Sequence, residues 1–131
     1  MKYKESLPRD VRELCAAHVR GYERRLEELS RKREAVYGSG RPEKAAEELE
    51  ALDKSGDSRS VQAVEAALLL ACHGIRSRTV CEHLRRGLVR NLCNRRLWPY
   101  ERLNLPGIGK KEFYRRKQDF LVALAEELGY L

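Results

Sequence analysis

The sequence lacks the short motifs that mark the common classes of enzyme. Its 131 residues contain no G-x-S-x-G turn, no Walker phosphate loop and no H-E-x-x-H zinc motif. Its acidic residues are scattered, and they form no spaced pair in an apolar setting. These absences predict a protein that is not an enzyme and that uses no cofactor.

Long apolar runs and paired cysteines are missing as well. No run of eighteen apolar residues occurs, and no apolar signal core follows the N-terminal residues Met1–Glu5. The cysteines form no C-x-x-C pair, since they stand at Cys15, Cys72, Cys81 and Cys93. We therefore expect a cytoplasmic protein with no membrane partner, with reduced and mostly buried thiols and without a metal site.

Strand-like alternation is also absent over any useful length, so the sequence predicts an all-α fold. Apolar residues recur in steps of three and four from residue 8 to residue 37, which predicts one long amphipathic helix, capped by Ser6 and with Pro8 in its first turn. Gly38–Pro42 ends this helix. Residues 1–57 are predicted to form a helical hairpin able to pair with a second copy of the chain, because a shorter stripe follows at Ala45, Leu49 and Leu52.

Two further helices are predicted in the middle of the chain. Asp57 or Ser58 can cap the first of them, a core helix that is apolar nearly all round. The second begins near Ser77 and has apolar positions at the spacing of a helix. Gly87 lies inside its pattern and weakens it by about 1 kcal/mol relative to Ala, which indicates a kink or a close helix contact.

Positive charge is concentrated in the second half of the chain. There are 27 Lys and Arg against 20 Asp and Glu, a net charge of +7. Residues 1–60 contribute +1 and residues 61–131 contribute +6, while the segment 76–117 alone reaches +10. A solvated helical surface normally mixes its charges, so this bias favours a polyanionic partner over a merely basic surface.

The end of the chain has the pattern of a short helix, a turn and a long helix. Pro99–Asn104 can form only a short helix, Leu105–Gly109 is a turn, and a long helix starts near Lys110. Lys117 falls in the apolar sector of that helix, so we expect its stem to pack while its ammonium reaches solvent. On a helical wheel the buried face consists of Phe113, Phe120, Leu121, Leu124 and Leu128.

The other side of this helix provides candidate contacts to double-stranded DNA. Lys111 and Arg115 project away from the core on the first two turns, and we expect them to reach base edges. Lys110, Tyr114 and Arg116 are expected to contact backbone phosphates. The remaining candidates are Glu112 and Gln118 on the same helix, together with Arg95 and Arg96 on the outside of the helix that begins near Ser77.

The same segment resembles a known family. Gly109–Lys117, followed by Phe120–Leu121 and Leu124–Gly129, is similar to the C-terminal signature of phage late-gene transcriptional regulators of the ArpU/RinA type. The resemblance implies a helix-turn-helix like that of the DNA-reading region of sigma factors, bound to phage or prophage promoter DNA and activating late or packaging genes. RNA polymerase is expected as a further partner of such a regulator. The chain departs from the family pattern where Gly109 replaces a capping Ser and Glu112 replaces a small hydroxyl residue.

Two structural interpretations remain beside the transcriptional regulator. Leu105–Gly109 also resembles the hairpin of helix-hairpin-helix modules, which hold the DNA backbone without reading sequence, although Phe113 stands where that motif usually has a small residue. A helical adaptor or a small DNA-packaging subunit would instead oligomerise through the long N-terminal helix and hold DNA with the basic half of the chain. In each case residues 1–57 are the arm and residues 58–131 the DNA-binding domain, which the regulator hypothesis describes as a helix-turn-helix.

Overall fold

The computed structural model describes residues 7–131, and over that range the chain is helical without any strand. The predicted all-α class is therefore confirmed. The predicted cap Ser6 lies outside the described residues. None of the described helices is long and apolar enough to cross a membrane. In chain order the helices are α2 (Arg9–Arg20), α3 (Tyr22–Gly38), α4 (Pro42–Asp53), α5 (Gly56–Ala71), α6 (Arg78–Cys93), α7 (Tyr100–Leu103) and α8 (Lys110–Glu127).

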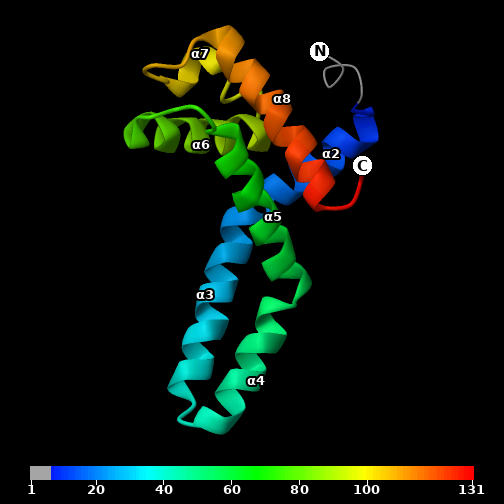
Figure 1. Cartoon of the computed structure of the whole chain (residues 1–131), viewed down its shortest axis with the longest axis vertical. Coiled ribbons are helices and arrows are strands. Elements are labelled where there is room, and N and C mark those ends of the chain that lie inside the picture. The colour runs from blue at the N-terminus through cyan, green and yellow to red at the C-terminus, as the bar shows by residue number, and fades with distance from the viewer. Residues whose placement is uncertain (1–6) are drawn as a thin grey trace.

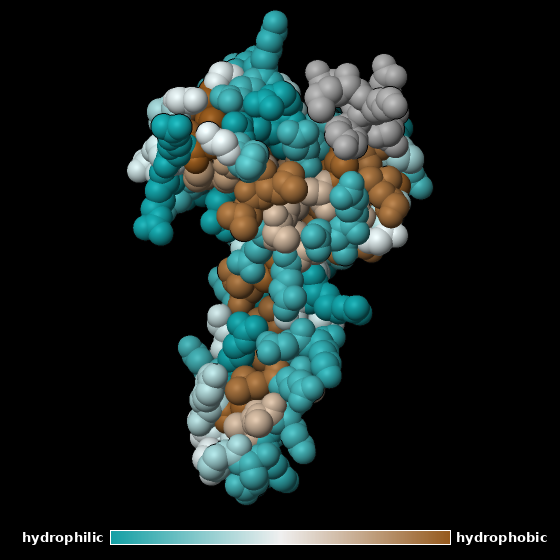
Figure 2. Space-filling view, viewed as in Figure 1, coloured by the Kyte–Doolittle hydropathy of each residue, from teal (hydrophilic) through white to brown (hydrophobic). Residues whose placement is uncertain are grey.

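The helices are arranged as a head and an arm (Figure 1). The head contains α2, α6, α7, α8 and the C-terminal part of α5, while α3 and α4 run side by side along the arm. α5 begins in the arm and ends against α8 in the head. The arm is mostly hydrophilic outside, with a narrow hydrophobic strip along it (Figure 2). Most of the apolar core therefore lies in the head.

The first helix predicted from the sequence is bent. In place of one helix over residues 8 to 37, α2 and α3 meet at Gly21 and point in different directions (Figure 1). A Cβ atom at Gly21 would lie 2.3 Å from Nη1 of Arg25, and this guanidinium donates a 3.2 Å hydrogen bond to the His18 carbonyl. The bend allows α2 to pack on α6 and α8 while α3 packs on α4 and α5. The prediction of a single helix is wrong at this point.

α8 provides the centre of the core. Phe113, Phe120 and Leu124 are fully buried, and Leu121 is nearly so. Leu128 is half-buried, which completes the apolar face predicted for this helix and confirms it. α5 is the main partner of α8. Small buried residues one turn apart on α5 allow a neighbouring helix to come close, namely Ala63, Ala67 and Ala71.

The starts of the two middle helices are capped by serine side chains. Ser55, rather than the predicted Asp57 or Ser58, caps α5, because its Oγ accepts a 3.3 Å hydrogen bond from the backbone N–H of Ser58. Ser77 caps α6 and accepts a 3.3 Å hydrogen bond from the N–H of Val80. Each cap satisfies a backbone donor that the helix itself leaves unpaired.

The four cysteines are free thiols. Cys15 and Cys72 are buried, and burial raises the pKa of each thiol to about 11. Cys81 is half-buried and Cys93 is exposed, so the expected burial is right for Cys15 and Cys72 and wrong for Cys93. A raised pKa lowers the thiolate fraction, which suits a packing role for the two buried thiols.

Two glycines keep the segment between α6 and α8 close to the head. A Cβ atom at Gly87 would lie 3.1 Å from Cδ2 of Leu105, so Gly87 marks a close contact. Gly107 has a φ of +82°, and a Cβ atom there would lie 3.2 Å from Cγ2 of Val80. A larger residue at either position would push the turn before α8 away from α6.

Gly107→Ala is expected to lower the free energy of unfolding by about 1–3 kcal/mol, because alanine is strained at positive φ and its methyl group would meet Val80. Gly74→Ala is the matched control, since Gly74 has a φ of +87° and no described atom within 4 Å of its Cβ position. Urea denaturation of both variants measures the difference. Equal losses would show that the contact with Val80 does not constrain the turn.

Candidate nucleic-acid interface

A groove of about 1460 Å³ runs between α2, the first half of α8 and the segment that follows α6. Sites for small molecules usually measure about 300–1000 Å³, so this groove has room for a larger ligand. Its buried lining residues, which we call the floor, are Leu92, Lys117 and Leu121. Basic side chains dominate the rest of the lining: Arg9, Arg12, Arg20, Arg95, Arg96, Lys110, Lys111 and Arg115.

The acidic residues of the groove are already paired. Among the described residues that line it, Glu13 and Glu112 are the acidic ones, against nine basic side chains. Glu13 lies 3.1 Å from Nε of Arg9, and Glu112 lies 3.6 Å from Arg115 and 3.4 Å from Arg116. Within residues 7–131, no three His, Cys, Asp or Glu side chains are placed to hold a metal ion. The chemistry of the groove therefore favours an anion.

The start of α8 is tied to α7. The Tyr100 hydroxyl donates a hydrogen bond to the Ile108 carbonyl, and the Tyr100 ring centroid lies 5.6 Å from that of Phe113. Nζ of Lys110 lies 3.1 Å from a carboxylate oxygen of Glu101, and its hydrogen bond lowers the pKa of that carboxyl. These contacts connect the two helices across the turn and orient the first turn of α8.

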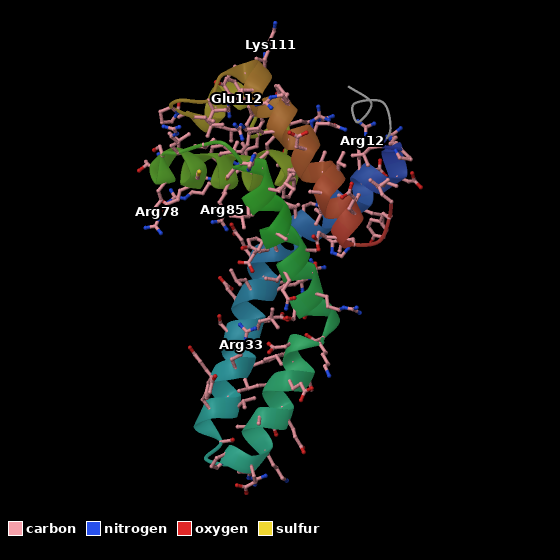
Figure 3. The ribbon with its side chains drawn as sticks, in the orientation of Figure 1. Arg12, Arg33, Arg78, Arg85, Lys111 and Glu112 are labelled. Carbon is pink, nitrogen blue, oxygen red and sulfur yellow. The ribbon has the colours of Figure 1, made fainter. Side chains whose placement is uncertain are left out.

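Lys111 and Arg115 lie one turn apart on α8 and are both exposed. Lys111 projects from the upper end of the head, while Arg12 projects from α2 (Figure 3). The side chain of Arg115 is 51% exposed. Tyr114 is exposed beside it, and its ring centroid lies 5.8 Å from Nζ of Lys117. The first two turns of α8 thus present both cationic and aromatic groups to the groove.

The structure brings eight of the nine predicted contact residues to this groove. They are Arg95, Arg96, Lys110, Lys111, Glu112, Tyr114, Arg115 and Gln118. Arg95 and Arg96 follow α6, and the other six belong to α8. Two segments separated along the chain therefore meet on one surface. The two ion pairs of Glu112 make this residue a counter-charge within the groove.

Arg116 is the exception, and its predicted contact with phosphate is wrong. Only 8% of this residue is exposed. Its Nη1 donates hydrogen bonds of 2.7 Å to the Ala71 carbonyl and 2.8 Å to the His73 carbonyl, where α5 ends. Cations are favoured at helix C-termini, whose last carbonyls have no partner within the helix. At 100° per residue Arg116 lies about 60° from Phe113, which is inside the buried sector. The helical wheel therefore already indicated that Arg116 would be buried.

Sequence reasoning missed the contribution of α2. Arg9, Arg12 and Arg20 line the groove from one face of this helix, together with Ala16. The steps of three, four and four residues place these positions on one side of a helix. The charge of +1 summed over residues 1–60 concealed this basic face, because acidic residues elsewhere in the segment cancel it.

Lys117 is the most deeply buried of the basic residues that line the groove. It is 9% exposed, and burial lowers its pKa to about 8, with further contributions from Arg95 and Arg12. The expected packing of its stem is confirmed, and Lys117 lines the groove. Burying a charge beside like charges costs free energy. The other cations around Lys117 add to that cost.

Lys117→Met is expected to raise the free energy of unfolding at pH 7 by about 1–3 kcal/mol, because it keeps the apolar stem and removes a desolvated charge. Above about pH 8 the folded protein releases the Lys117 proton, while the unfolded chain keeps it up to about pH 10.5. The wild-type protein therefore gains stability over this window, and the advantage of the variant shrinks.

Urea denaturation of the wild type and the variant at pH 7 and pH 10 measures this change. Lys111→Met, at an exposed position, is the control and should shift stability by less than about 0.5 kcal/mol. A Lys117→Met protein that is less stable than the wild type at pH 7 would contradict the expected charge penalty.

Comparison with family models, with curated proteins and with solved structures gives no match to this chain. The resemblance to regulators of the ArpU/RinA type therefore stays a prediction from residues 109–129.

Proposed function

We propose that the protein binds double-stranded DNA in the basic groove. One observation supports this most directly: nine basic side chains from α2, α8 and the segment after α6 converge on a single groove whose two acidic residues are already paired. A DNA duplex carries one negative charge per about 1.7 Å of its axis, and neutralising its phosphates releases counterions. A groove with this density of cations suits such a ligand.

Within this proposal α8 is a recognition helix, and α7 with the turn before α8 completes a helix-turn-helix in the domain 58–131. Lys111 and Arg115 support this role, because both are exposed on the first two turns of a helix whose far side is buried. These are the positions at which a recognition helix contacts base edges. Arg95, Arg96 and the arginines of α2 would then contact the backbone on both sides of α8.

The protein would act as a transcriptional regulator in the cytoplasm, encoded by a phage or prophage. The arm, within residues 1–57, would contact a second copy of the chain or RNA polymerase. Support for such a contact comes from the low burial of the arm. The structure describes every residue of α4, and none of them is buried. Helices with so little burial gain stability from a packing partner.

A structural DNA-binding protein is a second candidate, and the start of α8 favours it. Gly109 is exposed, and no described side chain caps α8 there. The first backbone N–H groups of a helix have no partner within the helix and suit a phosphate. A protein that relied on these amides would hold the DNA backbone without reading its sequence.

The groove is tested by measuring the binding of a labelled duplex at several salt concentrations. We expect the affinity to fall at least a hundredfold between 50 and 200 mM salt, because many phosphates are contacted. Replacing Arg12 and Arg20 together by Ala should lower the slope of log affinity against log salt by about two. Replacing Arg24 and Arg31, exposed on α3, should leave the slope unchanged. A wild-type protein that does not bind at 50 mM salt would refute the proposal.

Arg115→Ala separates the two candidates. In a regulator the variant should lose about 1–3 kcal/mol of binding free energy on a preferred genomic fragment and discriminate less between fragments. In a structural protein it should weaken all fragments alike. Selection of genomic fragments by the wild type and the variant measures both quantities, and Arg59→Ala on an exposed site of α5 is the control. Strong wild-type binding without any preference would rule out the regulator.

A further inference from the structure

We propose that the floor of the groove is a binding site for one phosphate group, held jointly by Lys117 of α8, Arg12 of α2 and Arg95 of the segment after α6. All three residues line the groove, and they come from three separate parts of the chain. This inference rests on the proposed function, because the phosphate is assigned to the DNA backbone. The proposed floor site is the one contact made with a buried lysine, whereas the other basic side chains that line the groove are exposed.

The Lys117 ammonium has no acidic partner among the described residues. Its residue is 9% exposed, and no ion pair or hydrogen bond joins it to any residue in the range 7–131. The centroid of the electron-rich Tyr114 ring lies 5.8 Å from its Nζ. Buried charges in proteins are normally paired. A lysine that is nine-tenths buried, that has no ion pair among the described residues and that lines a groove therefore indicates an anionic ligand.

The other charges around Lys117 point the same way. Arg12 and Arg95 are close enough to lower its pKa, after the larger effect of burial. Glu13 and Glu112, the acidic residues of the described lining, are held by Arg9 and by Arg115 and Arg116. Three cations thus line one groove in which each acidic residue is paired with another arginine. An anion placed between them would remove their mutual repulsion.

The donors fit a phosphate group in particular. Arg12 and Arg95 each carry a planar guanidinium that can donate two parallel hydrogen bonds, while Lys117 acts as a point charge. A phosphate has several acceptor oxygens and can meet donors from three directions. Leu92 and Leu121, also in the floor, provide an apolar environment in which these electrostatic interactions are stronger than in water. Because the groove is open, one phosphate of a longer chain can enter while the rest stays outside.

The first test uses inorganic phosphate alone. The wild type, Lys117→Met and the control Lys32→Met, at an exposed position of α3 outside the groove, are titrated with sodium phosphate against sodium chloride of equal ionic strength, and thermal unfolding is followed. We expect saturable stabilisation of the wild type, at least about tenfold weaker phosphate binding by Lys117→Met, and a change within about twofold for Lys32→Met. Equal binding by the wild type and Lys117→Met would overturn the floor site.

A second variant tests the same site in case Lys117→Met does not fold. Arg95 is exposed, so Arg95→Gln should fold normally and should weaken phosphate binding several-fold. Far-ultraviolet circular dichroism checks the fold of each variant. If Arg95→Gln and Lys117→Met both fold and both bind phosphate like the wild type, the site does not exist.

The second test uses the DNA duplex and identifies the source of the phosphate. Lys117→Met should weaken duplex binding about tenfold and lower the salt slope by about one. Loss of phosphate binding with unchanged duplex binding would overturn the assignment to the DNA backbone and leave a site for free phosphate. Failure of the wild type to bind DNA at 50 mM salt would refute the proposed function, whereas the inorganic-phosphate titration would still decide the floor site.

Discussion

Arg116 joins α8 to the end of α5, and the orientation of the groove depends on this contact. Its guanidinium satisfies two carbonyls at the C-terminus of α5, and Glu112 compensates part of its charge. An arginine buried in this geometry favours one position of α8 along α5, because its Nη1 donates to two carbonyls at once while its Nη2 lies 3.4 Å from Glu112. Once α8 is set in this way, Lys111 and Arg115 lie exposed at the groove and Lys117 lies in its floor.

Much of the fold could be predicted from the spacing of apolar residues. The buried face of α8, with Phe113, Phe120 and Leu124, follows directly from a period of 3.6 residues. The bend at Gly21 could not be predicted in this way, because the apolar pattern continues through it without interruption. What decides the bend is tertiary: α2 and α3 pack on different helices. Periodicity describes one helix at a time and contains no information about its partners.

The candidate site was likewise predictable in part, where its residues belong to one segment, and not where the fold brings separate segments together. Positive charge near the start of α8 and after α6 is visible in the sequence, and those residues do line the groove. The arginines of α2 were missed because more than fifty residues separate α2 from the other two segments, so only the fold brings them together. Arg116 was misassigned because its charge was given more weight than its angular position. The pairing of a cation with helix carbonyls is a contact between helices, and the sequence of one helix does not display it.

The bend at Gly21 also gives one stretch of sequence two roles. On one side of this residue α2 forms a wall of the groove, and on the other side α3 extends along the arm. A single straight helix could not pack on α6 and α8 at one end and on α4 and α5 at the other. The change of direction at this residue is therefore what lets the first segment contribute charge to the groove as well as length to the arm.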